Sequence, residues 1–237
     1  MKTIGLLGGM SWESTVLYYQ LLNQGVREQL GGLHSAKILM HSVDFAEIEQ
    51  LQVNGQWQQA GLQLADAARG LEKSGADMVL LCTNLMHKVA PVIAAQIKVP
   101  LLHIADATGS VITSQGLKNV ALLGTRYTME EDFYRQRLLD NFDLNVLIPE
   151  ADERDYIHTT IFNELCQGIF TSATRQNYLA IIDKLRTQGA EGVILGCTEI
   201  PLLIRQQDTD LPLFNTAALH AQFALQQVFT EDENNRS

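Results

Sequence analysis

Three consecutive residues near the end of the chain carry reactive side chains. Cys197, Thr198 and Glu199 supply a thiol, a hydroxyl and a carboxylate, and they directly follow the apolar run 193–195 and Gly196. Open α/β sheets build their sites in this way, by switching from a buried strand to reactive side chains at the strand's carboxyl end. We therefore predict that a functional site includes residues 197–199.

The chain contains an internal repeat that bears on this site. Residues 2–9 resemble 118–125, 75–81 resemble 189–195, and 100–103 resemble 212–215, at offsets of 116, 114 and 112 residues. Each match alone is weak because all buried strands are apolar and flanked by glycine. Their common order favours a duplicated α/β unit.

The repeat aligns Thr83 with Cys197 and Asn84 with Thr198. If the two copies face one another about a pseudo-twofold axis, Thr83 and Cys197 approach one cleft from opposite sides. Two groups on opposite sides of one carbon have the geometry needed to move a proton from one face of that carbon to the other.

Strands and helices are predicted to alternate along the chain. Strands are expected at residues 3–7, 38–43, 78–81, 99–104, 120–123, 144–148, 193–195 and 211–214. Helices are expected at residues 16–28, 56–73, 89–96, 106–114, 129–139, 152–167, 174–187 and 217–229, with a loop or short helix at 44–52. This alternation predicts an α/β fold with parallel sheets.

Composition restricts the class of protein. The chain has 237 residues and a net charge of −10, and it lacks a basic run that could neutralise nucleic-acid phosphates. It also lacks an apolar run of about 18 residues and an N-terminal signal sequence, which argues against a membrane protein. The widely spaced Cys82, Cys166 and Cys197 form neither a disulfide framework nor a metal site, so we expect a cytoplasmic protein with free thiols.

Three motifs resemble those of the cofactor-independent aspartate/glutamate racemase family. They are the segment 8–15 (GGMSWEST), the Asn84-x-x-His87 element, and the long segment 189–201 that contains Gly196-Cys197-Thr198-Glu199. The resemblance extends over essentially the whole chain. It implies two similar α/β halves with the site between them, an amino-acid substrate, no pyridoxal phosphate or other cofactor, and a homodimer. We expect halves at 1–114 and 115–215, then a C-terminal helix packing on the first half and a frayed tail within 216–237.

The resemblance further implies an acid/base pair of two cysteines, one in each half. Here Thr83 stands where the first cysteine is expected, and Cys82 comes one residue early. Successive strand residues point to opposite faces, so we interpret Cys82 as a buried structural thiol. Cys166 is also predicted to lie in the core, on a helix face with Phe162 and Ile169.

We predict that Cys197 is the main acid/base group, with its pKa lowered by backbone N–H groups and by His87. Thr83 is a poor base that can relay a proton or hold water, so the enzyme is expected to favour one enantiomer. His87 either orients the first loop or is structural. Glu199 is either a partner of the Cys197 loop or a salt-bridge residue.

Several further residues are predicted to hold the substrate. Asn84 and Thr198 follow the two acid/base positions, and they can donate hydrogen bonds to the substrate carboxylate. The remaining predicted substrate-binding residues are Met10 and Ser11 after the first strand, Gln52 as a lid, and Leu85 beside Asn84.

The substrate side chain is not fixed by these motifs. Acidic amino acids are the default, but residues 44–52 contain Asp44, Glu47 and Glu49 and no Lys or Arg, and Glu164 adds no positive charge. A broad-specificity racemase is therefore an alternative. Others are a hydantoin racemase, a maleate isomerase, an arylmalonate-type decarboxylase with a single cysteine, and a catalytically degenerate amino-acid-binding protein.

Overall fold

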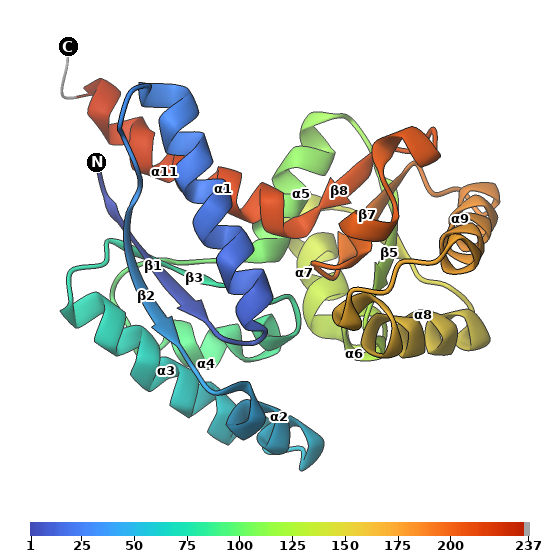
Figure 1. The fold of residues 1–237 in the computed structure, drawn as a ribbon, viewed down its shortest axis with the longest axis horizontal. Coiled ribbons are helices and arrows are strands. Elements are labelled where there is room, and N and C mark those ends of the chain that lie inside the picture. Colours follow the sequence, from blue (N-terminus) through green and yellow to red (C-terminus); the bar gives the residue numbers. More distant parts are fainter. Residues whose placement is uncertain (235–237) are drawn as a thin grey trace. The chain divides into compact units, whose positions relative to one another are not determined.

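The computed structural model describes residues 1–234 and divides into two compact units (Figure 1). The first unit contains Met1–Ile104 and the chain from Ala217 onward, and the second contains Ala105–Thr216. Helix α5 (Ile104–Ser114), which we expected in the first half, thus falls mainly in the second unit. The end of the predicted frayed tail, residues 235–237, lies outside the described residues. No helix within residues 1–234 has the length and apolar character needed to cross a membrane.

The first unit is built on a parallel four-stranded sheet with the order β2-β1-β3-β4. Its strands are β1 (Thr3–Gly8), β2 (Lys37–Ser42), β3 (Met78–Leu81) and β4 (Leu101–Leu102). Its helices are α1 (Trp12–Leu30), α2 (Phe45–Val53), α3 (Trp57–Lys73), the 3₁₀ helix η1 (Leu85–Val89), α4 (Ala90–Ala94) and α11 (Thr216–Asn234).

The second unit contains a parallel sheet with the corresponding order β6-β5-β7-β8. Its strands are β5 (Asn119–Gly124), β6 (Asn145–Leu147), β7 (Gly192–Gly196) and β8 (Leu213–Asn215). Its other elements are α5, α6 (Arg126–Glu130), α7 (Asp132–Phe142), α8 (Ala151–Asn163), η2 (Leu165–Gln167), α9 (Ser172–Thr187), α10 (Ile200–Leu203) and η3 (Gln206–Asp208). The predicted α/β fold with two similar parallel sheets is confirmed.

The register of the two sheets agrees with the sequence repeat. In the first sheet Leu7 of β1 pairs with Leu81 of β3, and in the second Leu123 of β5 pairs with Leu195 of β7. Leu123 follows Leu7 by 116 residues, and Leu195 follows Leu81 by 114 residues. These are the offsets of the sequence repeat. Thr83 and Cys197 are therefore equivalent positions, each two residues beyond the equivalent of Leu81.

The faces of the first sheet explain the burial of Cys82. Met78, Leu80 and Cys82 pack with α1 and α11, whereas Val79 and Leu81 pack with α2, α3 and the segment containing η1 and α4. Strand alternation sends successive side chains to opposite faces, so Thr83 is the next position on the α3 side. The prediction that Cys82 is a structural core thiol is confirmed, because its side chain is fully buried.

The second unit departs from the predicted helices where polar residues interrupt them. The predicted helix 129–139 is divided into α6 and α7 because Glu131 adopts an extended backbone between them. The predicted helix 152–167 ends at Asn163, and a 3₁₀ turn follows. Pro201 lies in the first turn of α10, where its missing N–H is tolerated.

Candidate active site

The second unit positions Cys197 at the carboxyl end of a central strand. Strand β7 is buried along its length between β5 and β8, and it ends at Gly196. A Cβ atom at Gly196 would lie 2.9 Å from the carbonyl oxygen of Leu123, so glycine permits the close approach of the neighbouring strand. The chain leaves the sheet at this point, and Cys197, Thr198 and Glu199 form a half-buried turn before α10. We call these three residues the Cys197 cluster.

Glu199 accepts hydrogen bonds from both of its neighbours in the Cys197 cluster. The Cys197 thiol donates to Oε2 of Glu199 at 2.9 Å, and the Thr198 hydroxyl donates to the same oxygen at 2.7 Å. The Glu199 carboxylate thus contacts the thiol directly, as in the first of the two roles we considered. One proton can be shared between sulfur and carboxylate without any change in the total charge of the pair.

The pKa of the Cys197 thiol lies well above its usual value, chiefly because of burial and then because of the Glu199 carboxylate. Both causes penalise the thiolate. We expected backbone N–H groups and His87 to lower this pKa. The Glu199 backbone N–H does lower it, but burial and the Glu199 carboxylate outweigh that effect. Cys197 therefore rests as a thiol that donates to Glu199.

Helices α8 and α9 contribute residues that the sequence did not suggest. Tyr178 of α9 is fully buried and shares a hydrogen bond of 3.0 Å with the hydroxyl of Thr160 on α8. Burial raises the pKa of Tyr178, and the charges of Cys197 and Glu164 act in the same direction. No spacing in the sequence identifies these residues, because the packing of α8 and α9 brings them to the Cys197 cluster.

The prediction for Cys166 was wrong. Its side chain is exposed, as are those of Phe162 and Ile169 at 49% and 46%. Helix α8 ends before Cys166, so the helical phase on which the prediction depended is lost in η2.

The carboxyl end of β5 lies beside that of β7, and a helix N-cap follows it. Thr125 is the N-cap of α6, and its Oγ1 accepts from the backbone N–H of Thr128 at 3.5 Å. Thr128 also lies against Gly196, since its Cγ2 would be 3.3 Å from a Cβ atom there. The sequence repeat indicates this turn between β5 and α6, because it aligns Gly124-Thr125 with Gly8-Gly9 after the first strand.

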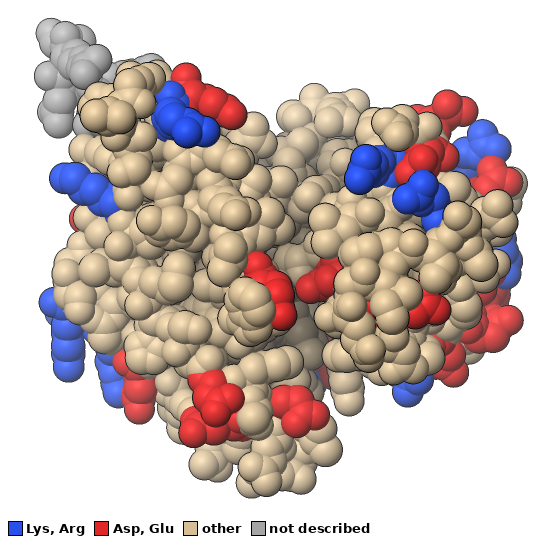
Figure 2. Space-filling view, in the orientation of Figure 1, with Lys and Arg blue, Asp and Glu red and all other residues tan. Residues whose placement is uncertain are grey.

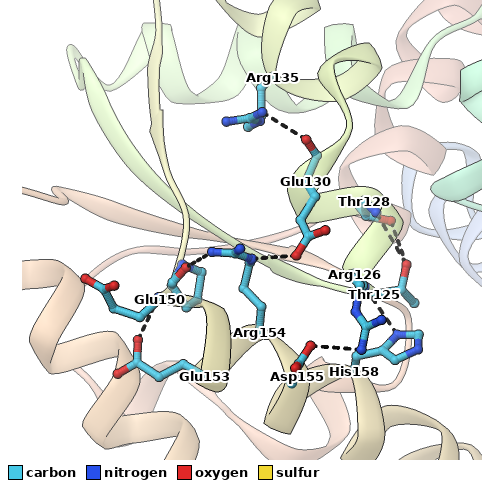
Figure 3. Close-up of polar contacts among 11 residues, drawn as sticks. Thr125, Arg126, Thr128, Glu130, Arg135, Glu150, Glu153, Arg154, Asp155 and His158 are labelled. Atoms are coloured by element: carbon cyan, nitrogen blue, oxygen red, sulfur yellow. Dashed lines mark hydrogen bonds and ion pairs between the residues drawn. The ribbon is translucent and has the colours of Figure 1, made fainter.

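Two arginines connect α6 to α8 beside this strand end (Figure 3). Arg126 pairs with Asp155 at 2.8 Å, and its backbone N–H donates to Nδ1 of His158 at 3.3 Å. Arg154 pairs with Glu130 at 2.8 Å (Figure 3). Arg126 lies two residues beyond the end of β5, but its guanidinium is already paired with the Asp155 carboxylate.

The first unit places Thr83 in a tight turn at the end of β3. The Thr83 N–H donates to the Leu81 carbonyl at 2.9 Å, and the Thr83 carbonyl lies 2.8 Å from Nδ1 of His87. Asn84 is 6% exposed, and it precedes η1, which begins with the half-buried Leu85. We call Thr83, Asn84 and His87 the Thr83 cluster.

The predicted contributors after β1 are engaged in local structure. Met10 is 5% exposed and packs in the core with Met86 and Ile48. Ser11 is the N-cap of α1, where its Oγ accepts from the Ser14 N–H at 3.3 Å. Gly9 has φ of +96°, and a Cβ atom there would lie 2.2 Å from the Val43 carbonyl oxygen, so this turn requires glycine.

Gln52 lies on helix α2 and contacts the element that follows the Thr83 turn. Its Nε2 lies 2.9 Å from Sδ of Met86 in η1, and the ammonium group of Lys88 in the same element lies 3.9 Å from the Trp57 ring centroid. The structure thus brings Gln52 beside the Thr83 cluster, within the first unit.

The surface of the protein carries charged side chains of both signs (Figure 2). On the face shown in Figure 2, Lys and Arg side chains lie toward the edges of the view, and the charged side chains in the middle are Asp and Glu. Residues 1–234 contain no group of three or more His, Cys, Asp or Glu side chains arranged to hold a metal ion.

The family of the chain follows from comparison with known proteins. The profile of the Asp/Glu/Hydantoin racemase family matches residues 7–224, which include both strand-end clusters. The chain therefore belongs to the Asp/Glu/Hydantoin racemase family, and the resemblance inferred from the three motifs is confirmed.

Solved and curated relatives agree with this assignment. A crystal structure of a candidate Asp/Glu racemase from Yersinia pestis is 52% identical, with a TM-score of 0.91 over 94% of this chain and 97% of that one. An aspartate racemase homologue from Pyrococcus horikoshii is 32% identical, with a TM-score of 0.86 over 96% and 99% of the two chains. The broad specificity amino-acid racemase RacX of Bacillus subtilis is 27% identical over 158 residues, which span 65% of this chain and 66% of RacX.

Proposed function

We propose that this protein is a cofactor-independent amino-acid racemase of the aspartate/glutamate class. The main support is the Cys197 thiol bonded to Glu199 at the end of β7, at the position equivalent to Thr83 at the end of β3. Family membership supports the reaction type. In this proposal, the Cys197 thiol and the Thr83 hydroxyl act on opposite faces of one substrate α-carbon.

The first step of the proposed mechanism uses the Cys197–Glu199 pair. The thiol proton moves along the existing 2.9 Å contact to Glu199, which leaves a thiolate and a neutral carboxylic acid. The thiolate then removes the α-proton, and the electron pair of the broken C–H bond passes into the substrate carboxylate as an enolate. Hydrogen-bond donors such as the Asn84 side-chain amide and the Thr198 backbone N–H stabilise this added charge.

The second step reprotonates the carbon from the opposite face. A proton comes from the Thr83 hydroxyl, or from water held there, and solvent restores it. Glu199 releases its extra proton to solvent, so the protons balance over one turnover. A threonine hydroxyl is a far weaker base than a thiolate, so removal of the α-proton from the Thr83 side is slow and one enantiomer is the better substrate.

Acidic amino acids are the proposed substrates by family membership. A broader range is the second candidate because Arg126, which follows β5, is paired with Asp155, and segment 44–52 carries only acidic charges. The similarity to RacX favours the same alternative. We further propose, from the family resemblance, a cytoplasmic homodimer, which sedimentation of the purified protein would test.

The decisive experiment is α-hydrogen exchange in deuterated water with a panel of L- and D-amino acids. The parent protein should exchange aspartate or glutamate, and exchange of neutral amino acids at similar rates would favour the broad-specificity alternative. Cys197→Ser should lower exchange at least about a thousandfold, because a serine hydroxyl is far less acidic than a thiol. Full exchange by Cys197→Ser would exclude the mechanism, and binding without exchange by the parent would favour an amino-acid-binding protein.

A further inference from the structure

The first unit contains a cluster of buried imidazoles that the proposed chemistry does not use. His87, His103 and His220 are 1%, 6% and 0% exposed. The His87 ring centroid lies 4.5 Å from that of His103 and 5.6 Å from that of His220. Burying polar rings is costly unless their nitrogens are hydrogen-bonded, so their partners indicate what they do.

The contacts of His87 determine its tautomer. The backbone N–H of Ile104 donates to Nε2 of His87 at 3.2 Å, so Nε2 carries no proton. Nδ1 lies 2.8 Å from the Thr83 carbonyl oxygen, which can only accept. His87 is therefore neutral, carries its proton on Nδ1, and donates it to Thr83. This arrangement does not fit an acid or base in the reaction.

His220 of α11 has the opposite tautomer. Its Nε2 lies 2.8 Å from the Leu102 carbonyl oxygen and must carry a proton. Its Nδ1 lies 2.9 Å from the Tyr18 hydroxyl of α1, which donates to the neutral ring. Tyr18 is fully buried as well.

These two pairs of hydrogen bonds are linked through the backbone of residues 102–104 in the first unit. Tyr18 donates to His220, and His220 donates to Leu102 at the end of β4. Two residues later, Ile104 donates to His87, which donates to Thr83. The series begins on α1, passes through α11 and the end of β4, and finishes at the backbone carbonyl of Thr83.

We propose that Tyr18, His220 and His87 are positioning residues that fix the Thr83 peptide, and that α11 is thus a functional part of the Thr83 cluster. This inference rests on the proposed racemase function. The Thr83 turn is held by its N–H on Leu81 and by its carbonyl on His87, so the direction of its Cα–Cβ bond is fixed. Proton transfer is sensitive to small displacements of the reacting groups, and loss of the His87 bond releases one side of this turn.

Two substitutions at His87 separate the two bonds of its ring. Asn places its Nδ2 near the position of Nδ1, so His87→Asn keeps the donor to Thr83 and loses the acceptor for Ile104. Gln reaches the position of Nε2, so His87→Gln keeps the acceptor and loses the donor. Both variants remove one hydrogen bond, so a merely structural role predicts similar effects on Tm and on activity.

The readout is the ratio of inversion to exchange, measured by chiral chromatography and by NMR in deuterated water. Cys197 alone can exchange the α-hydrogen with retention, but inversion also needs the Thr83 side. His87→Gln should slow inversion about tenfold and change exchange less than about twofold, whereas His87→Asn should keep both within about threefold. Equal loss of inversion and exchange in both variants, or no loss in either, would overturn the inference.

A third variant covers the case in which His87 substitutions prevent folding. Tyr18→Phe removes one hydroxyl at the far end of this series of hydrogen bonds and should lower the inversion-to-exchange ratio about two- to fivefold at unchanged KM. If the His87 variants do not fold and folded Tyr18→Phe keeps the parent ratio of inversion to exchange, the cluster is structural only. If the parent catalyses no exchange, the proposed function fails, whereas exchange with an unaltered ratio in every folded variant refutes only the positioning role.

Discussion

The Cys197 thiol lies 2.9 Å from Oε2 of Glu199, two residues further along the same turn. The carboxylate both raises the pKa of the thiol and provides the nearest acceptor for its proton. Loss of the thiol proton to solvent leaves two adjacent negative charges, on Cys197 and Glu199. Transfer of that proton to Glu199 leaves only one. The balance between thiol–carboxylate and thiolate–carboxylic acid does not depend on pH, because both forms hold one proton.

Glu199→Gln should convert a flat pH profile into a steep one. Without the carboxylate, Cys197 must lose its proton to solvent, and burial still keeps its pKa high. We expect α-hydrogen exchange by the parent to vary little between about pH 6 and 8, and exchange by Glu199→Gln to fall about a hundredfold at pH 7 and then rise about tenfold per pH unit. The measurement is the initial exchange rate against pH.

The control for this variant is Glu28→Gln, which removes the same charge from an exposed position on α1. Its profile should match that of the parent. Parallel profiles for Glu199→Gln and the parent would show that Glu199 does not accept the thiol proton.

Thr83→Cys should speed up the slower of the two directions. The substitution places a thiol at the position equivalent to Cys197, so the weaker base is replaced by a stronger one. We expect about a tenfold or greater gain in the initial rate from the poorer enantiomer, with less change in the other direction. Thr83→Ser, which keeps a hydroxyl, is the matched control and should show no gain. A lower rate from both enantiomers with Thr83→Cys would contradict the equivalence of the two positions.

Gly196→Ala should disturb the Cys197 turn. The added Cβ atom would lie 2.9 Å from the Leu123 carbonyl oxygen, so β7 must shift against β5. We expect destabilisation of about 1–3 kcal/mol in urea unfolding, together with a loss of exchange activity in the folded protein.

Gly70→Ala is the opposite control for the same change. Gly70 lies inside α3, it is exposed, and an added Cβ would meet nothing within 4 Å. Alanine at a helix interior position should stabilise the protein by about 0.5–1 kcal/mol and leave exchange unchanged. A Gly196→Ala protein as stable and active as the parent would show that the turn tolerates a shifted strand.

Much of the fold could be predicted because buried parallel strands have a strong local pattern. The strand 78–81 was predicted with the observed bounds of β3, and the repeat offsets reappear as strand register. The errors occurred where tertiary packing or a short turn controls the backbone. Glu131 divides a predicted helix, and η2 moves Cys166 from the predicted core to the surface.

The equivalence of positions 83 and 197 was predictable from the sequence, but the electrostatics around Cys197 were not. Cys197 and Thr83 follow directly from the repeat, whereas the sequence alone could not choose between two roles for Glu199. The bond to the thiol depends on the side-chain directions in one turn. His220 lies 137 residues after Thr83, and only the return of α11 to the first unit connects them.

A pair of equivalent carboxylates provides the last prediction, on stability. Asp77 accepts from the backbone N–H of Thr3 at 2.7 Å, and its equivalent Glu191 accepts from those of Lys118 and Asn119 at 2.8 Å each. Each side chain precedes a central strand and bonds to the beginning of its neighbour. The Asn119 and Lys118 hydrogen bonds lower the pKa of Glu191. A lowered pKa stabilises the fold above the carboxyl group's unfolded pKa, and this stabilisation is lost as pH falls through the folded one.

Glu191→Gln should therefore lower Tm by about 1–3 °C at pH 7. The difference should shrink as pH falls below the ordinary carboxyl pKa of about 4.3, and close only below the lowered pKa of folded Glu191. Asp77→Asn should also lower Tm at pH 7, because it weakens the acceptor of the Thr3 N–H in the first unit. Glu28→Gln, at an exposed position, should leave Tm close to that of the parent. Calorimetric scans of the three variants and the parent at several pH values test this. A gap of constant size down to pH 3 would show that the side-chain shape at position 191 matters, and that its charge does not.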